Sequence, residues 1–295
     1  MQGENPKENV RGVPSMKKQL EVLKTTIEIG LEKPLKLLHI TDTHLAFDDP
    51  GKDSGRQRHF EGEHKGCIAD YYFQAVDYAR KNGLLIVNTG DMIDFLSEEN
   101  FAFVDKHLKG IDCIYAAGNH DFCHCVGEAK EDAEYKRNNM KITAPHFNTN
   151  LLFDSRVTGG VNFVTLDNSY YLISDGQVDM LRAEAARGYP IVLCVHVPFY
   201  TDALAKDTYD RGNDCTYLVA APEEHLKTYN DYRRNQQTPD EATLRAVDYI
   251  MNEPLIKAVI AGHMHCNFDD TLSNGIPQLV THGTYAGYAR EITIL

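Results

Sequence analysis

The chain has 295 residues, of which 42% are hydrophobic and 25% charged, and its net charge is -13. This acidic surplus excludes general electrostatic attraction as a basis for binding nucleic acid or an anionic membrane. No apolar run approaches the roughly 20 residues of a membrane span, and the polar N-terminus shows no secretory signal. We therefore expect a cytoplasmic protein whose seven scattered cysteines are free thiols.

The elements expected in chain order are strands that alternate with helices, and they indicate one domain over residues 17–295 after a tail at 1–16. The first half predicts strands at 20–29 and 35–40, a helix at 67–81, a strand at 84–87, a helix at 97–108 and a strand at 113–116. The second half predicts strands at 151–157 and 161–167, a helix at 176–187, a strand at 191–195, a helix opened by a capping box at 238–241 that reaches about residue 251, and strands at 258–261, 278–282 and 291–295. This alternation predicts an α/β architecture, and the expected hairpins favour a mixed pair of β-sheets.

Five of the short apolar runs are followed at once by Asp, Asn or His. These clusters are Asp42 with His44, Asp91, the run from Asn119 to Asp121, His196, and His263 with His265. In α/β folds, ligands bind beyond the carboxyl ends of the strands, so we expect all five clusters to line one shared site.

The side chains in these clusters predict a metal centre. Seven of them are candidate ligands, namely Asp42, His44, Asp91, Asn119, His196, His263 and His265. Nitrogen and oxygen donors without a thiolate suit Mn, Fe or Zn. Seven residues are too many for one tetrahedral ion, whereas one bridging carboxylate would let them serve two. Two divalent ions with two aspartates and a shared hydroxide leave a positive site, which suits in-line attack on the phosphorus of an anionic ester.

In this order, the motifs resemble those of the calcineurin-like metallophosphoesterases: Asp42-x-His44, Gly90-Asp91, Gly118-Asn119-His120-Asp121, a lone strand-end His196 and Gly262-His263-x-His265. The resemblance implies a four-layer αββα sandwich. It assigns the first metal to Asp42, His44, Asp91 and His265, and the second to Asn119, His196 and His263, with Asp91 bridging. It also implies that His120 assists the transition state or protonates the leaving oxygen, and that Asp121 orients His120.

Departures from subfamily patterns narrow the expected activity. Asp121 stands where serine/threonine protein phosphatases carry Glu, and Asp94 stands where purple acid phosphatases carry a Tyr ligand. The pattern is closer to the broad group of cyclic-nucleotide phosphodiesterases and small phosphohydrolases. We expect a small phosphorylated substrate, a mono- or diester with nucleotides included. The alternatives are a non-catalytic metal-binding scaffold, a structural metalloprotein and a nuclease; the complete ligand set disfavours the scaffold, and the acidic charge disfavours the nuclease.

Segments and histidines outside the motifs carry further expectations. An insert at about 200–237, rich in Tyr, Asp and Arg, is a candidate roof over the site, with a surface ornament as the alternative. Residues 47–64 are a second candidate rim through Arg56 and Arg58. We expect His39 to pack in its sheet, and His282 is a candidate to approach the centre. If the strand continues past Gly262, His263 and His265 face one site while Met264 turns away.

Overall fold

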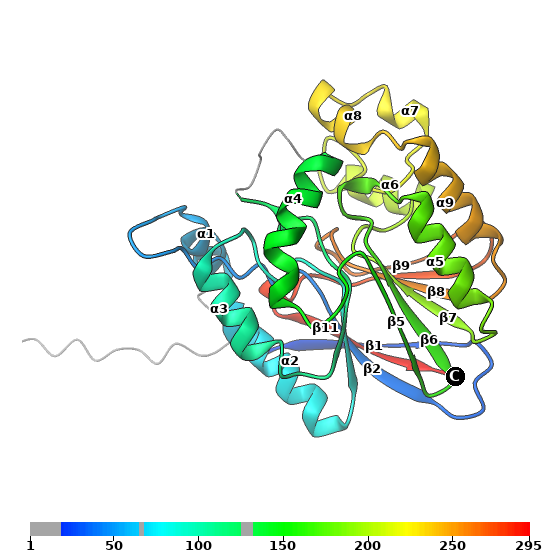
Figure 1. The fold of residues 1–295 in the computed structure, drawn as a ribbon, viewed down its shortest axis with the longest axis horizontal. Helices are drawn as coiled ribbons and strands as arrows, with labels where there is room; N and C mark the ends of the chain where they lie inside the picture. The colour runs from blue at the N-terminus through cyan, green and yellow to red at the C-terminus, as the bar shows by residue number, and fades with distance from the viewer. Residues whose placement is uncertain (1–18, 65–67, 125–131) are drawn as a thin grey trace, which may run out of the picture.

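A computed structural model describes residues 19–64, 68–124 and 132–295, and the tail expected at 1–16 lies outside them. Two β-sheets lie face to face, and helices cover the outer face of each (Figure 1). The first sheet contains, in spatial order, β1 (Glu21–Ile27), β11 (Tyr288–Ile294), β2 (Leu35–Ile40), β3 (Leu85–Asn88) and β4 (Cys113–Tyr115). The second contains β5 (Phe153–Thr158), β6 (Val161–Leu166), β7 (Ile191–Cys194), β8 (Ile256–Ala261), β10 (Pro277–Val280) and β9 (Phe268–Thr271).

Both sheets are mixed, as the sequence predicted. In the first sheet, β2, β3 and β4 run parallel while β11 pairs antiparallel with β2. In the second sheet, β6, β7, β8 and β10 run parallel, with antiparallel partners β5 and β9 at the edges. The carboxyl ends of neighbouring parallel strands therefore meet at the same edge of each sheet.

Helices form the two outer layers. Helices α2 (Ile68–Asn82) and α3 (Glu98–His107) cover the first sheet, and α5 (Asp175–Ala185) and α9 (Glu241–Asn252) cover the second. The others are α1 (Arg56–His64), α4 (Ala133–Thr143), α6 (Asp202–Asp210), α7 (Glu223–Leu226) and α8 (Asp231–Gln237). Within the described ranges, no helix has both the length and the apolar character needed to cross a membrane.

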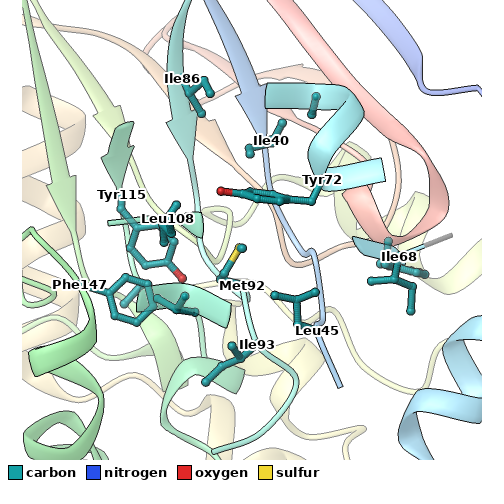
Figure 2. Close-up of a cluster of buried hydrophobic side chains, with 14 of the residues drawn as sticks. Ile40, Leu45, Ile68, Tyr72, Ile86, Met92, Ile93, Leu108, Tyr115 and Phe147 are labelled. Carbon is teal, nitrogen blue, oxygen red and sulfur yellow. The ribbon is translucent and has the colours of Figure 1, made fainter. Parts of the chain in front are cut away.

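Alternating side chains divide the core into three layers and thereby produce the four-layer sandwich. In β7, Val192 packs between the two sheets, whereas Leu193 packs under the helices of the second sheet. In β2, Leu37 packs between the sheets and Leu38 faces the helices of the first sheet. Figure 2 shows part of this outer cluster, where Tyr72 of α2 lies against the first sheet. Burial of each such side chain contributes about 1.5–3 kcal/mol.

Several local expectations are confirmed, and one is wrong. Ser97 caps α3 as expected, with its side chain accepting from the Asn100 amide. The capping box at 238–241 does not form, because Thr238 ends α8 and donates its hydroxyl proton to the Arg234 carbonyl. Asp240 caps α9 instead. Five cysteines of the described residues are free thiols, as expected: Cys113, Cys123, Cys194, Cys215 and Cys266.

Candidate metal centre

The loops that follow β2, β3, β4, β7 and β8 bring all seven predicted ligands together where the two sheets meet. Ligand atoms of Asp42, His44 and His265 lie within 4.8 Å of one another, and so do those of Asp91, His196 and His263. His44, Asp91 and His120 form a third such group.

The first group centres on imidazole nitrogens that face a carboxylate. Asp42 Oδ1 lies 3.2 Å from His265 Nε2 and 3.6 Å from His44 Nε2. The two imidazole nitrogens are 3.1 Å apart. All three atoms therefore converge on one point, although Asp42 and His265 are 223 positions apart in the chain.

The second group has the same character and adds an amide oxygen. His196 Nε2 lies 3.2 Å from Asp91 Oδ2, 3.1 Å from Asn119 Oδ1 and 3.2 Å from His263 Nδ1. Asp91 Oδ2 is also 3.7 Å from His44 Nε2 of the first group. One carboxylate oxygen thus faces both groups, which is the position a bridging ligand requires.

Hydrogen bonds on the far side of each ring test whether a cation fits. His196 Nδ1 is 2.7 Å from the Thr89 carbonyl, which only accepts, so Nδ1 carries the proton. In the neutral ring, Nε2 is then a lone pair that faces the acceptor oxygens of Asp91 and Asn119. His44 Nδ1 likewise donates to Asp94 at 3.0 Å, which leaves its Nε2 as an acceptor. In their neutral forms, both rings thus add a lone pair to the carboxylate and amide oxygens that face them, and such a set of acceptors suits a metal ion.

The pKa shifts of His44 and His196 also indicate that the surrounding carboxylates favour positive charge at this site. Burial opposes protonation of His44, but the carboxylates of Asp42 and Asp94 outweigh it and raise its pKa to about 10. Burial also opposes protonation of His196, and Asp91 raises its pKa to about 9. Burial and the charge on His196 lower the pKa of His263 to about 3, which keeps its imidazole neutral. Cations bound among these side chains would replace the protons.

The backbone of the ligand loops is strained. Five of the seven predicted ligands have left-handed backbone conformations, with φ of 48° at Asp42 and His44, 52° at Asp91, 67° at His263 and 49° at His265. Such φ values are uncommon outside glycine and cost free energy that the surrounding structure must supply. They correct the expectation for Gly262 onward: β8 ends at Ala261, and the two histidines reach the same site through left-handed turns. Met264 is buried in a cluster with Leu204, Leu218 and Val280.

Two glycines are required by close approach of the loops. A Cβ on Gly262 would lie 1.9 Å from Thr41 Oγ1 and 2.5 Å from Asp42 Oδ2. A Cβ on Gly118 would lie 2.1 Å from Asp91 Oδ1. Larger residues at either position would push a ligand carboxylate out of place.

The structure changes the expected partner of His120. His120 Nδ1 lies 2.9 Å from the Asp94 carbonyl and 3.3 Å from Asp94 Oδ1. Asp121, the residue expected to orient it, instead accepts from the backbone amides of Asp91, Met92 and Gly118 and from the Tyr115 hydroxyl. Asp121 therefore fixes the loop that carries Asp91, because its carboxylate is committed to that backbone. Asp94, three residues after Asp91, is a functional candidate that the sequence reasoning missed.

Other histidines and tyrosines form the surroundings of the ligands. His39 packs in the sheet as expected, with its ring nitrogens 2.7 Å from Thr281 Oγ1 and 2.8 Å from Thr89 Oγ1. The hydroxyl of Tyr171 lies 3.1 Å from His263 Nε2, and that of Tyr285 lies 3.0 Å from His265 Nδ1. Nothing in the local sequence indicated these two tyrosines. His282 stacks on Tyr288 and belongs to none of the three ligand groups.

A cavity of about 380 Å³ opens over the ligands. Its lining includes Asp91, Asn119, His120, His263 and His265. The 200–237 segment contributes Arg211, Asn213, Tyr217, Tyr232, Arg233 and Gln236. Neither Arg56 nor Arg58 of the second candidate rim belongs to this lining: Arg56 pairs with Asp94, and Arg58 pairs with Asp53 on the surface.

Comparisons with known proteins found similarity to one family model and to solved structures. The family model described as calcineurin-like phosphoesterase matches residues 35–267. Among solved structures, a dimetal phosphatase from Danio rerio is similar, with a TM-score of 0.52 and 16% identity over 85% of this chain and 88% of that one. A putative 5'-nucleotidase from Staphylococcus aureus gives a TM-score of 0.44 and 13% identity over 85% of this chain and 49% of its own. The search of curated proteins gave no match.

Proposed function

Because the chain belongs to the calcineurin-like phosphoesterase family, we propose that it hydrolyses small phosphorylated compounds at a centre of two metal ions. Membership makes it a metal-dependent hydrolase of phosphoric esters. The observation that carries the two-metal proposal is Asp91, whose Oδ2 faces His44 in one ligand group and His196 in the other. Nitrogen and oxygen donors support Mn, Fe or Zn as the ions.

We assign the residues as follows. Asp42, His44, Asp91 and His265 would hold one ion; Asp91, Asn119, His196 and His263 would hold the other. Bound there, two such ions would lower the pKa of a water molecule and neutralise charge on the phosphoryl oxygens.

His120 is the candidate general acid. Its ring lines the cavity, and its Nδ1 donates to the Asp94 carbonyl, so a second proton on Nε2 is available for a leaving oxygen. Burial opposes that charge, but Asp91 and Asp94 outweigh burial and raise the His120 pKa. General-acid catalysis of this kind is typically worth about 10²–10⁴-fold.

The cavity supports a small substrate. A volume of about 380 Å³ lies within the range of small-molecule sites. A nuclease is disfavoured by the net charge of -13, and a scaffold does not account for an open cavity above a complete ligand set.

Metal analysis of the purified protein, joined to hydrolysis of bis(p-nitrophenyl) phosphate and p-nitrophenyl phosphate, tests the proposal. We expect about two ions per chain, and chelation should abolish activity while circular dichroism stays native. Asp91→Asn should remove activity and lower the metal content. The matched control Asp105→Asn changes an exposed carboxylate that pairs with Lys109 and His146, and it should do neither.

Three outcomes would overturn the assignment. One ion per chain would refute the two-metal centre. Unfolding on chelation would favour a structural metal site instead. Wild-type turnover by Asp91→Asn would refute the bridging role.

A further inference from the structure

Within the ranges that the structure describes, Arg233 is a cation without an anionic partner, in a chain whose net charge is -13. Ten of the arginines that the structure describes form an ion pair with a carboxylate: Arg56, Arg58, Arg80, Arg156, Arg182, Arg187, Arg211, Arg234, Arg245 and Arg290. Among those described residues, no carboxylate lies within ion-pair distance of Arg233 or of exposed Arg137. Of these two arginines, Arg233 lines the cavity over the candidate metal centre, whereas Arg137 does not.

Aromatic rings hold this guanidinium close to the centre. Its carbon lies 4.8 Å from the ring centroid of Tyr217 and 5.2 Å from that of Tyr232. The Tyr217 ring in turn lies 6.2 Å from the ring of His263, a candidate ligand. Arg233 is therefore two contacts away from His263, a candidate ligand of the metal centre.

Tyr217 and Tyr171, which both line the cavity, have a strained backbone. Tyr217 has φ of 55° and Tyr171 has φ of 65°, both in the left-handed region that bulky residues rarely adopt. Such strain concentrates at binding and catalytic sites, where the surrounding structure holds it in place. The position of these rings beside His263 is therefore a built feature of the cavity.

We propose that Arg233, held by Tyr217, is a subsite for a second anionic group of the substrate, a phosphate or a carboxylate. The proposal rests on the proposed function and names its substrate class: phosphoric esters that carry another negative charge a short distance from the reacting phosphorus. A planar guanidinium presents parallel N–H donors that match either anion. One of them already donates to Gln236 at 3.1 Å, which fixes its orientation.

The same contacts argue against a subsite for a nucleobase. A base would stack on an aromatic face, but the guanidinium of Arg233 lies over the rings of both Tyr217 and Tyr232. Among the described residues, Arg233 also lacks the carboxylate partner that each of the ten paired arginines has, so its charge is available to an anionic group.

Two matched substrate pairs test the subsite in the Mn²⁺-loaded protein. The first pair is thymidine 5'-(p-nitrophenyl phosphate) with and without a 3'-phosphate. The second is 3-phosphoglycerate against propane-1,2-diol 1-phosphate. This pair exchanges a carboxylate for a methyl group, and the carboxylate lies closer to the reacting phosphorus than the 3'-phosphate of the first pair does. We expect kcat/KM to favour the doubly anionic member of at least one pair by about 10- to 100-fold. Which pair shows the preference distinguishes phosphate from carboxylate.

Variants tie that preference to Arg233. Arg233→Gln should reduce it to less than threefold, Arg233→Lys should keep part of it, and Arg137→Gln, the matched unpaired arginine, should keep all of it. Calorimetric binding of thymidine 3',5'-bisphosphate against thymidine 5'-monophosphate should show the same order. A preference below twofold in both pairs, or one that survives in Arg233→Gln, would overturn the subsite. Absence of all hydrolysis would instead refute the proposed function, and the calorimetric comparison would still decide the subsite.

Discussion

Replacing Asp94 by asparagine should weaken proton donation by His120 while leaving its orientation largely intact. The hydrogen bond at 2.9 Å runs from His120 Nδ1 to the main-chain carbonyl of Asp94, which the substitution keeps. The carboxylate at 3.3 Å is lost. Asp94→Asn therefore removes the negative charge beside His120 but keeps the hydrogen bond that orients its ring.

The size of the effect follows from the distance between the charges. At 3.3 Å and an effective dielectric constant of about 20, the attraction between Asp94 and protonated His120 is about 5 kcal/mol. Arg56, which donates to both oxygens of Asp94, offsets part of this attraction. A net loss on the order of 3 kcal/mol would lower the His120 pKa by about two units. At pH values above the original His120 pKa, about a hundredfold less of the imidazolium then remains to act as an acid.

The assay is kcat for a series of phosphate esters whose leaving groups differ in pKa, measured across pH with saturating metal. Saturation matters because Asp94 also accepts from His44, and loss of such an outer partner typically weakens metal binding by about 10- to 100-fold. Asp94→Asn should slow alkyl esters far more than p-nitrophenyl esters and move the descending limb of the pH profile to lower pH. The control Asp105→Asn, an exposed carboxylate beside His146, should change neither. An unchanged dependence on the leaving group together with an unmoved limb would refute this reasoning.

Three further substitutions test separate parts of the site. His120→Ala should slow alkyl esters by about 10²–10⁴-fold and p-nitrophenyl esters much less, because p-nitrophenolate leaves without a proton; equal losses would contradict the general-acid role. Gly262→Ala should reduce the metal content, since its Cβ would lie 1.9 Å from Thr41 Oγ1. A wild-type metal content would show that the loops can move apart without displacing the ligands, and it would contradict this expectation. Tyr171→Phe should weaken metal binding about 10- to 100-fold in calorimetric titrations without changing the melting temperature of the metal-free protein, because it removes the hydroxyl at 3.1 Å from His263; undiminished affinity would count against that support.

The sequence predicted the layers and the meeting of the ligands because both depend on local pattern. Short apolar runs such as Leu35–Ile40 are buried on both faces, and their abrupt change to Asp or His marks the carboxyl end of a strand. Five such ends at one edge leave little freedom in where the side chains gather. For the same reason, the loops that carry Asp42 and Asp91 could be placed together without any structural data.

What the sequence did not predict depends on tertiary contacts. The left-handed backbone of His263 and His265 follows from contacts with Thr41 and Asp42, which lie more than 200 positions away. The partner of His120 likewise depends on how Asp94 folds back, whereas the resemblance to the phosphoesterase family implied Asp121. The helices of the 200–237 segment are short, with nine, four and seven residues, and loops carry part of the cavity lining, so its residues could be suspected but not placed.

The position of the candidate centre at the seam between the two sheets has a consequence for the folded state. Asp42 and Asp91 follow strands of one sheet, whereas His196 and His265 follow strands of the other. Ions held by these side chains would act as a cross-link between the two halves of the sandwich. Because only the folded chain assembles the ligands, a free metal concentration a thousandfold above Kd would stabilise it by about 4 kcal/mol. The free metal concentration would then set the free energy needed to unfold the sandwich, as well as the activity of the site.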